Sequence, residues 1–140
     1  MRLLITTPAA VVVDESGVVA VRAEDDSGSF GVLEGHAAFL TALTIAVVSW
    51  RQAGGPQRFC AVRRGVLSVA NGSQVAIATR EAILGDDLDR LEHVVLAQFH
   101  QALEAERKAR TESLQLQMRA IRQIVRYLRP ERSGIFGAAP

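Results

Sequence analysis

The hydrophobic pattern of this 140-residue chain changes its period at Gly85, and this change limits what the chain can fold into. Before Gly85, β-branched residues form short runs separated by turn-forming residues, a pattern that is typical of strands. After it, apolar residues recur every three or four positions, and no glycine or proline interrupts the 44 residues before Pro130. The sequence therefore predicts a strand-rich head over residues 1–85, a helical part over 86–130 and a disordered tail over 131–140.

Short strands are predicted in the head at residues 3–6, 10–13, 18–23, 45–50, 58–62, 66–69 and 75–79. The clearest turn between them is Asn71-Gly72, because a tight hairpin needs positive φ at both central residues and these residue types accept it. Strands joined by such turns, with no helical pattern between them, favour an antiparallel sandwich or barrel over a parallel sheet. We therefore expect an all-β head.

Two apolar stripes follow in the helical part. The first stripe consists of Leu88, Leu91, Val95, Phe99 and Ala102, and the second consists of Leu114, Met118, Ile121, Val125 and Leu128. A polar stretch separates them, so we expect a break near residues 109–113 and two antiparallel helices, with one long helix as the alternative. Because a helix hairpin has little core of its own, its stability depends on burial against a partner. Asp86 or Asp87 is suited to cap the first helix.

The net charge is only +1, but the charges are segregated along the helical part. Residues 86–106 carry six acids and one arginine, whereas residues 113–130 carry four arginines and no acid. Arg119, Arg122 and Arg126 lie along one side of the predicted second helix. A solvated surface, an acidic protein partner and a nucleic acid all fit such a side. Few aromatic residues are available to stack on bases, so we expect no nucleic-acid partner.

The patterns of common enzyme and metal sites are absent from the sequence. The chain has no phosphate-binding loop, dinucleotide fingerprint, nucleophile elbow or zinc-protease motif. His93 and His100 are seven residues apart, which does not suit a metal clip on a helix, and the lone Cys60 is predicted to be buried. The longest uncharged stretch has 16 residues, fewer than the roughly 20 that cross a bilayer as a helix. We expect a non-catalytic cytoplasmic protein with no metal and no cofactor.

One segment, residues 28–43, does not follow the strand-and-turn pattern. Its sequence, GSFGVLEGHAAFLTAL, resembles the signature of the epsilon subunit of F-type ATP synthases, typically GEFGVLPGHAPLLTAL. Residues 1–8, 64–69 and 85–89 resemble further family segments, in the same order and spacing. The resemblance extends over about residues 1–92 and then weakens to a general two-helix pattern.

The resemblance implies both a fold and a function. The implied fold is a β-sandwich of about ten short antiparallel strands followed by an antiparallel two-helix hairpin. The implied function is that of a non-catalytic rotor subunit of the central stalk, which links the gamma subunit to the c-ring in proton- or sodium-coupled ATP synthesis. Such a subunit lies at the cytoplasmic face of the bacterial inner membrane, touches the membrane only indirectly and is a monomer in isolation. Its helices can reach the alpha and beta subunits and inhibit ATP hydrolysis.

The resemblance also assigns roles to individual residues. A loop near the rotor interface is implied for Ser29, Phe30, Gly31, Glu34, Gly35 and His36, and a regulatory helix is implied for Arg119, Arg122 and Arg126. For His36, holding the loop through backbone hydrogen bonds is an equal alternative to contacting a partner. Arg63-Arg64-Gly65 replaces the family's small-Gly-Gly triplet, which is harmless if both arginine side chains point into water or toward gamma.

Some positions depart from the family pattern. Ser29 stands where the family has an acid and Glu34 replaces a proline, so the expected charge has moved along the loop. Glu92 stands where nucleotide-sensing members have a phosphate-binding arginine, and a carboxylate repels phosphate. The residues that could still contribute to a nucleotide site of the family's kind are Asp89, Arg122 and Arg126. We therefore expect weak or absent ATP binding.

A different class of function also fits the two-part pattern. The chain could be a stand-alone β-sandwich adaptor whose helices form a coiled-coil dimer or bind RNA.

Overall fold

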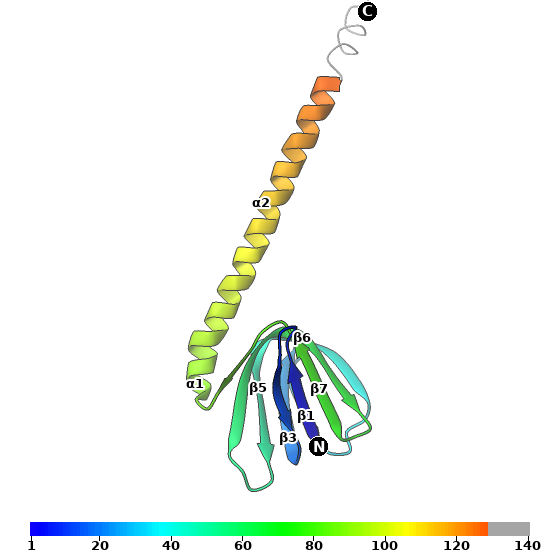
Figure 1. The fold of residues 1–140 in the computed structure, drawn as a ribbon, viewed down its shortest axis with the longest axis vertical. Coiled ribbons are helices and arrows are strands. Elements are labelled where there is room, and N and C mark those ends of the chain that lie inside the picture. Colours follow the sequence, from blue (N-terminus) through cyan, green and yellow to red (C-terminus); the bar gives the residue numbers. More distant parts are fainter. Residues whose placement is uncertain (129–140) are drawn as a thin grey trace, which may run out of the picture. The chain divides into compact units, whose positions relative to one another are not determined.

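The computed structural model of the protein describes residues 1–128, in which eight strands precede a helical segment (Figure 1). The strands are β1 (Arg2–Thr6), β2 (Val11–Glu15), β3 (Val18–Asp25), β4 (Gly28–Leu33), β5 (Phe39–Gln52), β6 (Gln57–Ala70), β7 (Gln74–Thr79) and β8 (Ala82–Gly85). The helical segment consists of α1 (Leu88–Arg90), the π-helical turn η1 (Leu91–Val95) and α2 (Leu96–Leu128). The chain divides into two compact units after His100.

The head is a sandwich whose two sheets share their longest strands. The strand order is β2-β1-β7-β6-β5-β3-β4, with β8 beside β6, and neighbours are antiparallel except β1 and β7. β6 pairs with β8 through residues 59–62 and with β7 through residues 65–70, so its two halves belong to different sheets. We call β4, β3, β8 and the adjoining halves of β5 and β6 the helix-bearing sheet, and β2, β1, β7 and the other halves the opposite sheet.

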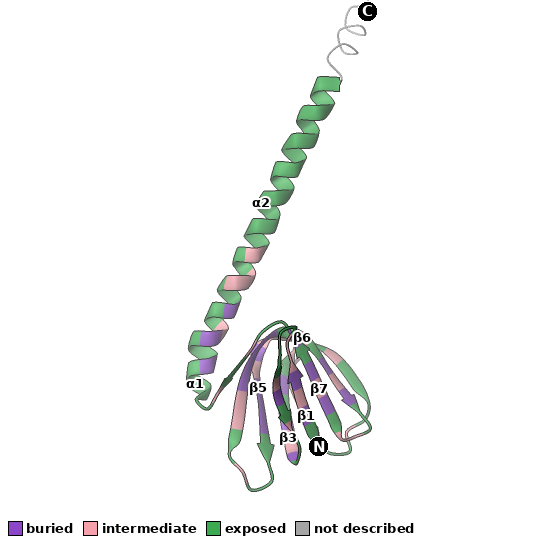
Figure 2. Cartoon of the chain, viewed as in Figure 1, coloured by how far each residue is buried: buried purple, intermediate pink, exposed green. Residues whose placement is uncertain are grey.

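Buried residues, purple in Figure 2, recur along the strands of both sheets. Their side chains form one hydrophobic core. Leu3, Ile5, Leu67 and Ile77 come from the opposite sheet, while Val21, Val48, Trp50 and Val62 come from the helix-bearing sheet. Cys60 is also buried and unpaired, as predicted, and burial raises the pKa of its thiol to about 12. The all-β sandwich is thus confirmed, with eight strands in the described chain where the family resemblance implied about ten.

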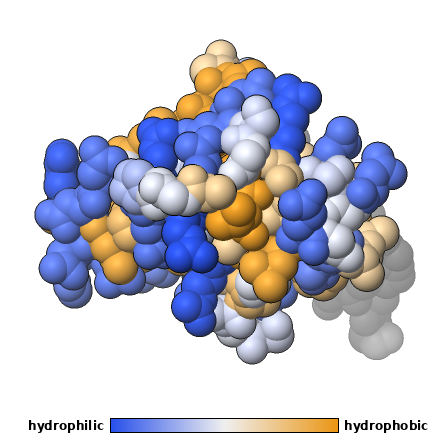
Figure 3. Space-filling model, turned by 90° about the horizontal axis from the view of Figure 1, so that it is seen from below, coloured by the Kyte–Doolittle hydropathy of each residue, from blue (hydrophilic) through white to orange (hydrophobic). Residues whose placement is uncertain are grey.

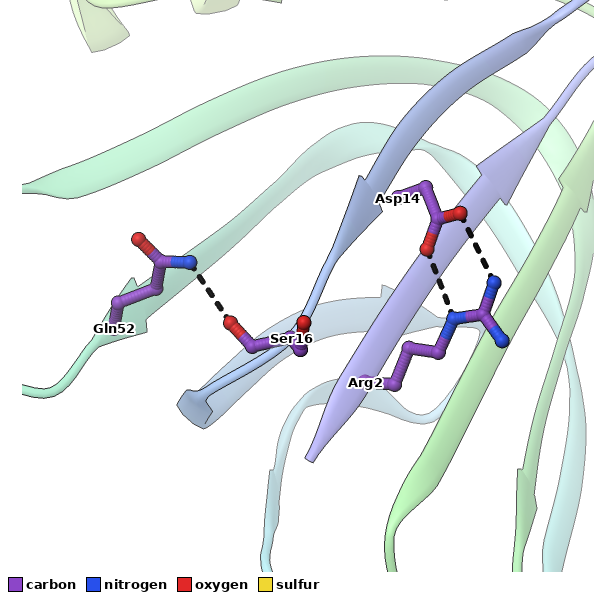
Figure 4. Close-up of polar contacts among 4 residues, drawn as sticks. All are labelled: Arg2, Asp14, Ser16 and Gln52. Carbon is purple, nitrogen blue, oxygen red and sulfur yellow. Dashed lines mark hydrogen bonds and ion pairs between the residues drawn. The ribbon is translucent and has the colours of Figure 1, made fainter.

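Polar contacts tie the ends and edges of the strands. The Trp50 indole donates to the Glu15 carboxylate over 2.8 Å, and Arg58 pairs with the same carboxylate. On the outside of β1 and β2, Arg2 donates twice to Asp14, over 2.9 and 3.0 Å (Figure 4). These two hydrogen bonds hold the pKa of Asp14 below its ordinary value.

Strand β6 changes sheets at a local distortion of its backbone. Arg64 and Gly65 have φ of 58° and 147°, and the Thr79 hydroxyl donates to the Arg64 carbonyl. A Cβ atom on Gly65 would lie 2.1 Å from the Ala78 carbonyl oxygen, so only glycine fits there. The condition that both arginines point into water or toward gamma is not met by Arg63, because its side chain is buried and pairs with Glu81 over 3.5 Å.

The helical segment begins at a capped end on the helix-bearing sheet. Asp87 accepts hydrogen bonds from the amides of Asp89 and Arg90, over 3.0 and 3.5 Å. Residues four apart drift by about 40° around an α-helix, and the wider π-turn η1 offsets this drift. Leu91, Val95 and Phe99 are therefore all buried, and they pack on Ala61 of β6.

The predicted break near residues 109–113 is not present, so the expected hairpin is corrected to one continuous helix. α2 runs from Leu96 to Leu128, as the alternative reading allowed. The Thr111 hydroxyl donates to the Arg107 carbonyl four residues earlier over 2.9 Å, a contact made inside a helix and not at its start. No described helix is long and apolar enough to cross a membrane. The predicted tail lies outside the described residues.

Because the β7 backbone lies so close to Gly65, a single methyl group added at this position should strongly destabilise the fold. Gly65→Ala should lower the free energy of unfolding by at least about 2 kcal/mol, since the new Cβ meets backbone atoms that cannot move aside. Chemical denaturation of the purified subunit measures this change. Gly55→Ala is the matched control: the added Cβ would lie 3.6 Å from the nearest atoms, so its effect should stay within about 0.5 kcal/mol. Equal effects of the two substitutions would contradict the account.

Candidate functional site

The segment that the sequence singled out lies at the free edge of the helix-bearing sheet. Ser29, Phe30 and Gly31 are in β4, which pairs only with β3 in the described chain. Glu34 and Gly35 form the turn after β4, and His36 begins the connection to β5. The structure thus brings these six predicted residues together along one edge and one loop.

Aromatic rings hold the loop against the end of β5. Phe30 meets Phe39 edge to face, with ring centroids 5.5 Å apart, and His36 meets the same ring at 5.7 Å. The His36 Nδ1 atom lies 2.7 Å from the Ala37 carbonyl oxygen, to which it donates when it carries a proton. These contacts are those expected for a histidine that holds the loop, and its half-buried ring keeps a surface for a partner as well.

Two hydrogen bonds between residues distant in sequence hold the segment in place. The Gly35 amide donates to the Gly72 carbonyl over 2.7 Å, which ties the loop to the Asn71-Gly72 turn. Near the carboxyl end of the segment, Thr41 donates to Asp25 over 2.8 Å, and hydrogen bonds from Ser27 and Thr41 lower the pKa of that carboxyl. Sequence reasoning missed both ties, because neither follows from a local pattern. The predicted hairpin turn itself is confirmed, with φ of 56° and 65° at Asn71 and Gly72.

A second surface, which sequence reasoning did not single out, lies on the outside of the opposite sheet. Cross-strand pairing places an uncharged row across five strands: Ala42, Val66, Ala78, Thr6 and Val11. We call this row, together with Leu40 on β5 and Leu4 on β1, the apolar face. Leu40 is 71% exposed, Val11 61% and Val66 45%. The period-two alternation along β5 and β6 could have revealed it, since Leu40, Ala42 and Val66 are apolar residues at outward positions.

At the ends of the strands, hydrophobic and hydrophilic residues are both exposed on the surface. Seen from below the strands of Figure 1, hydrophobic patches lie among hydrophilic groups (Figure 3). Large apolar side chains exposed on the described chain are therefore not confined to the apolar face: Leu33 at the end of β4 is 63% exposed.

The predicted regulatory arginines all lie on α2. Arg119, Arg122 and Arg126 are exposed and form no ion pair within the described chain. Beside them runs the second apolar stripe, and all of its members are exposed: Leu114, Met118, Ile121, Val125 and Leu128. α2 thus presents an apolar stripe bordered by positive charge, and within residues 101–128 no other segment covers either of them.

The residues proposed for nucleotide contact are divided between the two units. Asp89 belongs to the first unit, while Arg122 and Arg126 belong to the second. Ligand atoms of Asp89, Glu92 and His93 lie within 4.8 Å of one another and are exposed. Two carboxylates at this point disfavour a phosphate group. Weak or absent ATP binding therefore stays a prediction.

Comparison with known proteins adds an independent result. Residues 1–85 match the family described as "ATP synthase, Delta/Epsilon chain, beta-sandwich domain". The chain is 49% identical to "ATP synthase epsilon chain 2" of Paraburkholderia xenovorans, over 94% of this chain and 95% of the relative. It is 44% identical to the protein of the same name in Cereibacter sphaeroides, over 91% and 88%.

Solved structures agree on the fold. A chain of the Euglena gracilis mitochondrial ATP synthase superimposes with a TM-score of 0.57 at 24% identity, over 76% of this chain and 62% of that one. A chain from the central stalk and c-ring of the Tetrahymena thermophila enzyme gives a TM-score of 0.52 at 16% identity, over 74% and 90%. With the family match over the sandwich and close relatives over nearly the whole length, the chain belongs to the ATP synthase delta/epsilon family and is an epsilon subunit of an F-type ATP synthase.

Proposed function

We propose that this epsilon subunit is a non-catalytic part of the rotor, which joins the gamma subunit to the c-ring during proton- or sodium-coupled ATP synthesis at the cytoplasmic face of the bacterial inner membrane. The observation that carries this proposal is the uncharged apolar face, a solvent-exposed row that crosses five neighbouring strands of the sandwich. Surfaces of this kind on soluble domains serve as binding sites for other proteins.

The apolar face is the proposed binding site for gamma. Its residues lie on five hydrogen-bonded strands, from β2 at the edge of the sheet through β1, β7 and β6 to β5, so the surface is ordered before binding. Burial of Leu40, Val66 and Val11 would remove most of their exposed apolar area from water, which favours association.

The free-edge strand β4 and the loop after it, from Ser29 to His36, form the proposed contact for the polar loops of the c-ring. We call this part of the chain the edge segment. Ser29 and Glu34 are exposed there, while Phe30 and Gly35 are held by the contacts to Phe39 and Gly72. A fixed backbone with polar side chains directed outward can meet a polar loop without first ordering itself.

The arginine side of α2 is the proposed regulatory contact with the alpha and beta subunits. Arg119, Arg122 and Arg126 offer three guanidinium groups to an acidic surface of a beta subunit. The neighbouring stripe supplies apolar area for the same contact. Binding there would hold the rotor against the catalytic subunits and so inhibit ATP hydrolysis.

The spacing of that stripe also supports a second candidate function. Leu114, Met118, Ile121, Val125 and Leu128 follow one another at intervals of 4, 3, 4 and 3, which is the pattern of a coiled-coil seam. A stand-alone adaptor would use this seam to form a homodimer. Analytical ultracentrifugation of the isolated subunit distinguishes the two, because the rotor proposal requires a monomer that pairs with gamma.

The gamma proposal predicts the effect of a buried charge. Val66→Glu should weaken binding of the subunit to gamma by about tenfold or more, because the carboxylate would lose its hydration in an apolar interface. Surface plasmon resonance with purified gamma measures the affinity. Val94→Glu serves as the control, since Val94 is 49% exposed but lies on η1. If Val66→Glu bound gamma as tightly as the unmodified chain, the apolar face would not be the binding site.

The regulatory proposal predicts relief of inhibition. Reversing all three charges, with Arg119→Glu, Arg122→Glu and Arg126→Glu, should raise ATP hydrolysis by the reconstituted complex, because the new carboxylates repel an acidic partner. A second triple variant with Arg107→Glu, Lys108→Glu and Arg110→Glu changes the same total charge elsewhere on α2. Hydrolysis that stayed unchanged in the first variant, or rose equally in both, would count against the assignment.

A further inference from the structure

The outside of the helix-bearing sheet carries a basin of about 420 Å³. Its polar lining consists of Arg22 on β3, Ser29 on β4, Ser49 and Arg51 on β5, and Gln57 on β6. We call these five residues and the hollow between them the arginine basin. No acidic residue lines it. The basin is distinct from the apolar face and from the positions considered for nucleotide contact.

Strand register explains why a hollow forms here. Arg22 pairs across the sheet with Ser49 on one side and with Gly31 on the other, while Arg51 pairs with Ala20 and Gln57. Small residues thus alternate with long ones on this face. A Cβ atom on Gly31 would have only the Val21 carbonyl oxygen within 4 Å, at 3.9 Å, so the space above it is open.

The polar groups of the basin are hydrogen-bond donors that lack an acceptor. Neither Arg22 nor Arg51 forms a hydrogen bond or ion pair with any described residue. Ser49 as a whole is only 8% exposed, and its hydroxyl makes no hydrogen bond within residues 1–128. No side-chain nitrogen or oxygen of the described residues is both fully enclosed and without a hydrogen-bond partner, so the Ser49 hydroxyl must open onto the basin that this residue lines. It can therefore donate a hydrogen bond to a ligand held there by Arg22 and Arg51.

Charges beyond the rim limit where such a ligand fits. An adjoining groove shares Arg22, Ser29, Ser49 and Gln57 with the basin, but it is also lined by Glu24 and Glu92. An anion is attracted to the arginine end and repelled from this acidic end. The favourable position is therefore between Arg22 and Arg51, over the Ser49 hydroxyl.

We propose that the arginine basin binds a phosphate group, either as inorganic phosphate or as part of a small phosphate ester. A guanidinium group pairs with two phosphate oxygens at once, and two such groups with a hydroxyl between them suit a doubly charged tetrahedral anion. The volume exceeds that of phosphate alone and leaves room for the rest of an ester. This proposal does not depend on the binding of gamma.

The test titrates the isolated full-length subunit with potassium phosphate, adenosine monophosphate or sodium acetate at constant ionic strength. Backbone amide shifts in NMR spectra and isothermal calorimetry report binding. We expect saturable phosphate binding, with shifts centred on residues 29–31 and 49–51, and weaker binding of acetate. Adenosine monophosphate that bound more tightly than phosphate would identify the ester as the ligand, and equal affinities would identify inorganic phosphate; either result supports the proposal.

Variants separate a built site from general attraction to positive charge. Arg22→Gln and Arg51→Gln should each weaken phosphate binding by about tenfold, and Ser49→Ala should weaken it by a smaller factor. Arg110→Gln removes an exposed arginine from α2 and should leave the affinity unchanged. Thermal unfolding of each variant verifies that it is folded. No saturation up to about 50 mM phosphate at fixed ionic strength, or binding that survives both arginine substitutions, would overturn the proposal.

Discussion

The close approach of the β6 backbone to β7 at Gly65 is the constraint on which the rest of this fold depends. It allows one 14-residue strand to leave β8 and join β7, so that β5 and β6 serve two sheets with one core between them. The Ala78 carbonyl oxygen occupies the place that a Cβ atom on residue 65 would need. At the same point the Thr79 hydroxyl donates a hydrogen bond to the Arg64 carbonyl. Packing and hydrogen bonding at this position together keep the sandwich closed.

Because the two sheets are closed against each other, each has one outer face, and the two faces differ in chemistry. On the helix-bearing sheet, the π-turn aligns Leu91, Val95 and Phe99 so that the base of the helix is held on Ala61, and the arginine basin lies beside it. The opposite sheet presents the uncharged apolar face, with the Arg2–Asp14 ion pair beside it on β1 and β2. Under the two proposals, gamma and a small anion would therefore bind to different sides of the same sandwich.

The features that could be predicted from the sequence are those determined by residues close together along the chain. Period-two runs and the Asn71-Gly72 pair located most of the strands and their clearest turn, and Asp87 caps the helix as expected. The prediction missed β4 and β8, and it divided β6 into two strands at Gly65, where the backbone is distorted but the strand continues. The ties of Gly35 to Gly72 and of Thr41 to Asp25 join residues far apart in sequence, so no local pattern contains them. The prediction of a helix break was wrong for a different reason. A polar stretch without glycine or proline can remain helical, as residues 109–113 do.

The central claim is that the sandwich holds the start of the helix, whereas the exposed stripe from Leu114 to Leu128 is stabilised only by a partner. Hydrogen exchange measured by mass spectrometry, on the subunit alone and in the assembled ATP synthase, tests this claim directly. The account predicts slow exchange at residues 91–99 in both samples. At residues 107–128 it predicts rapid exchange in the isolated subunit and slow exchange after assembly. Equal, strong protection of residues 107–128 in both samples would contradict it.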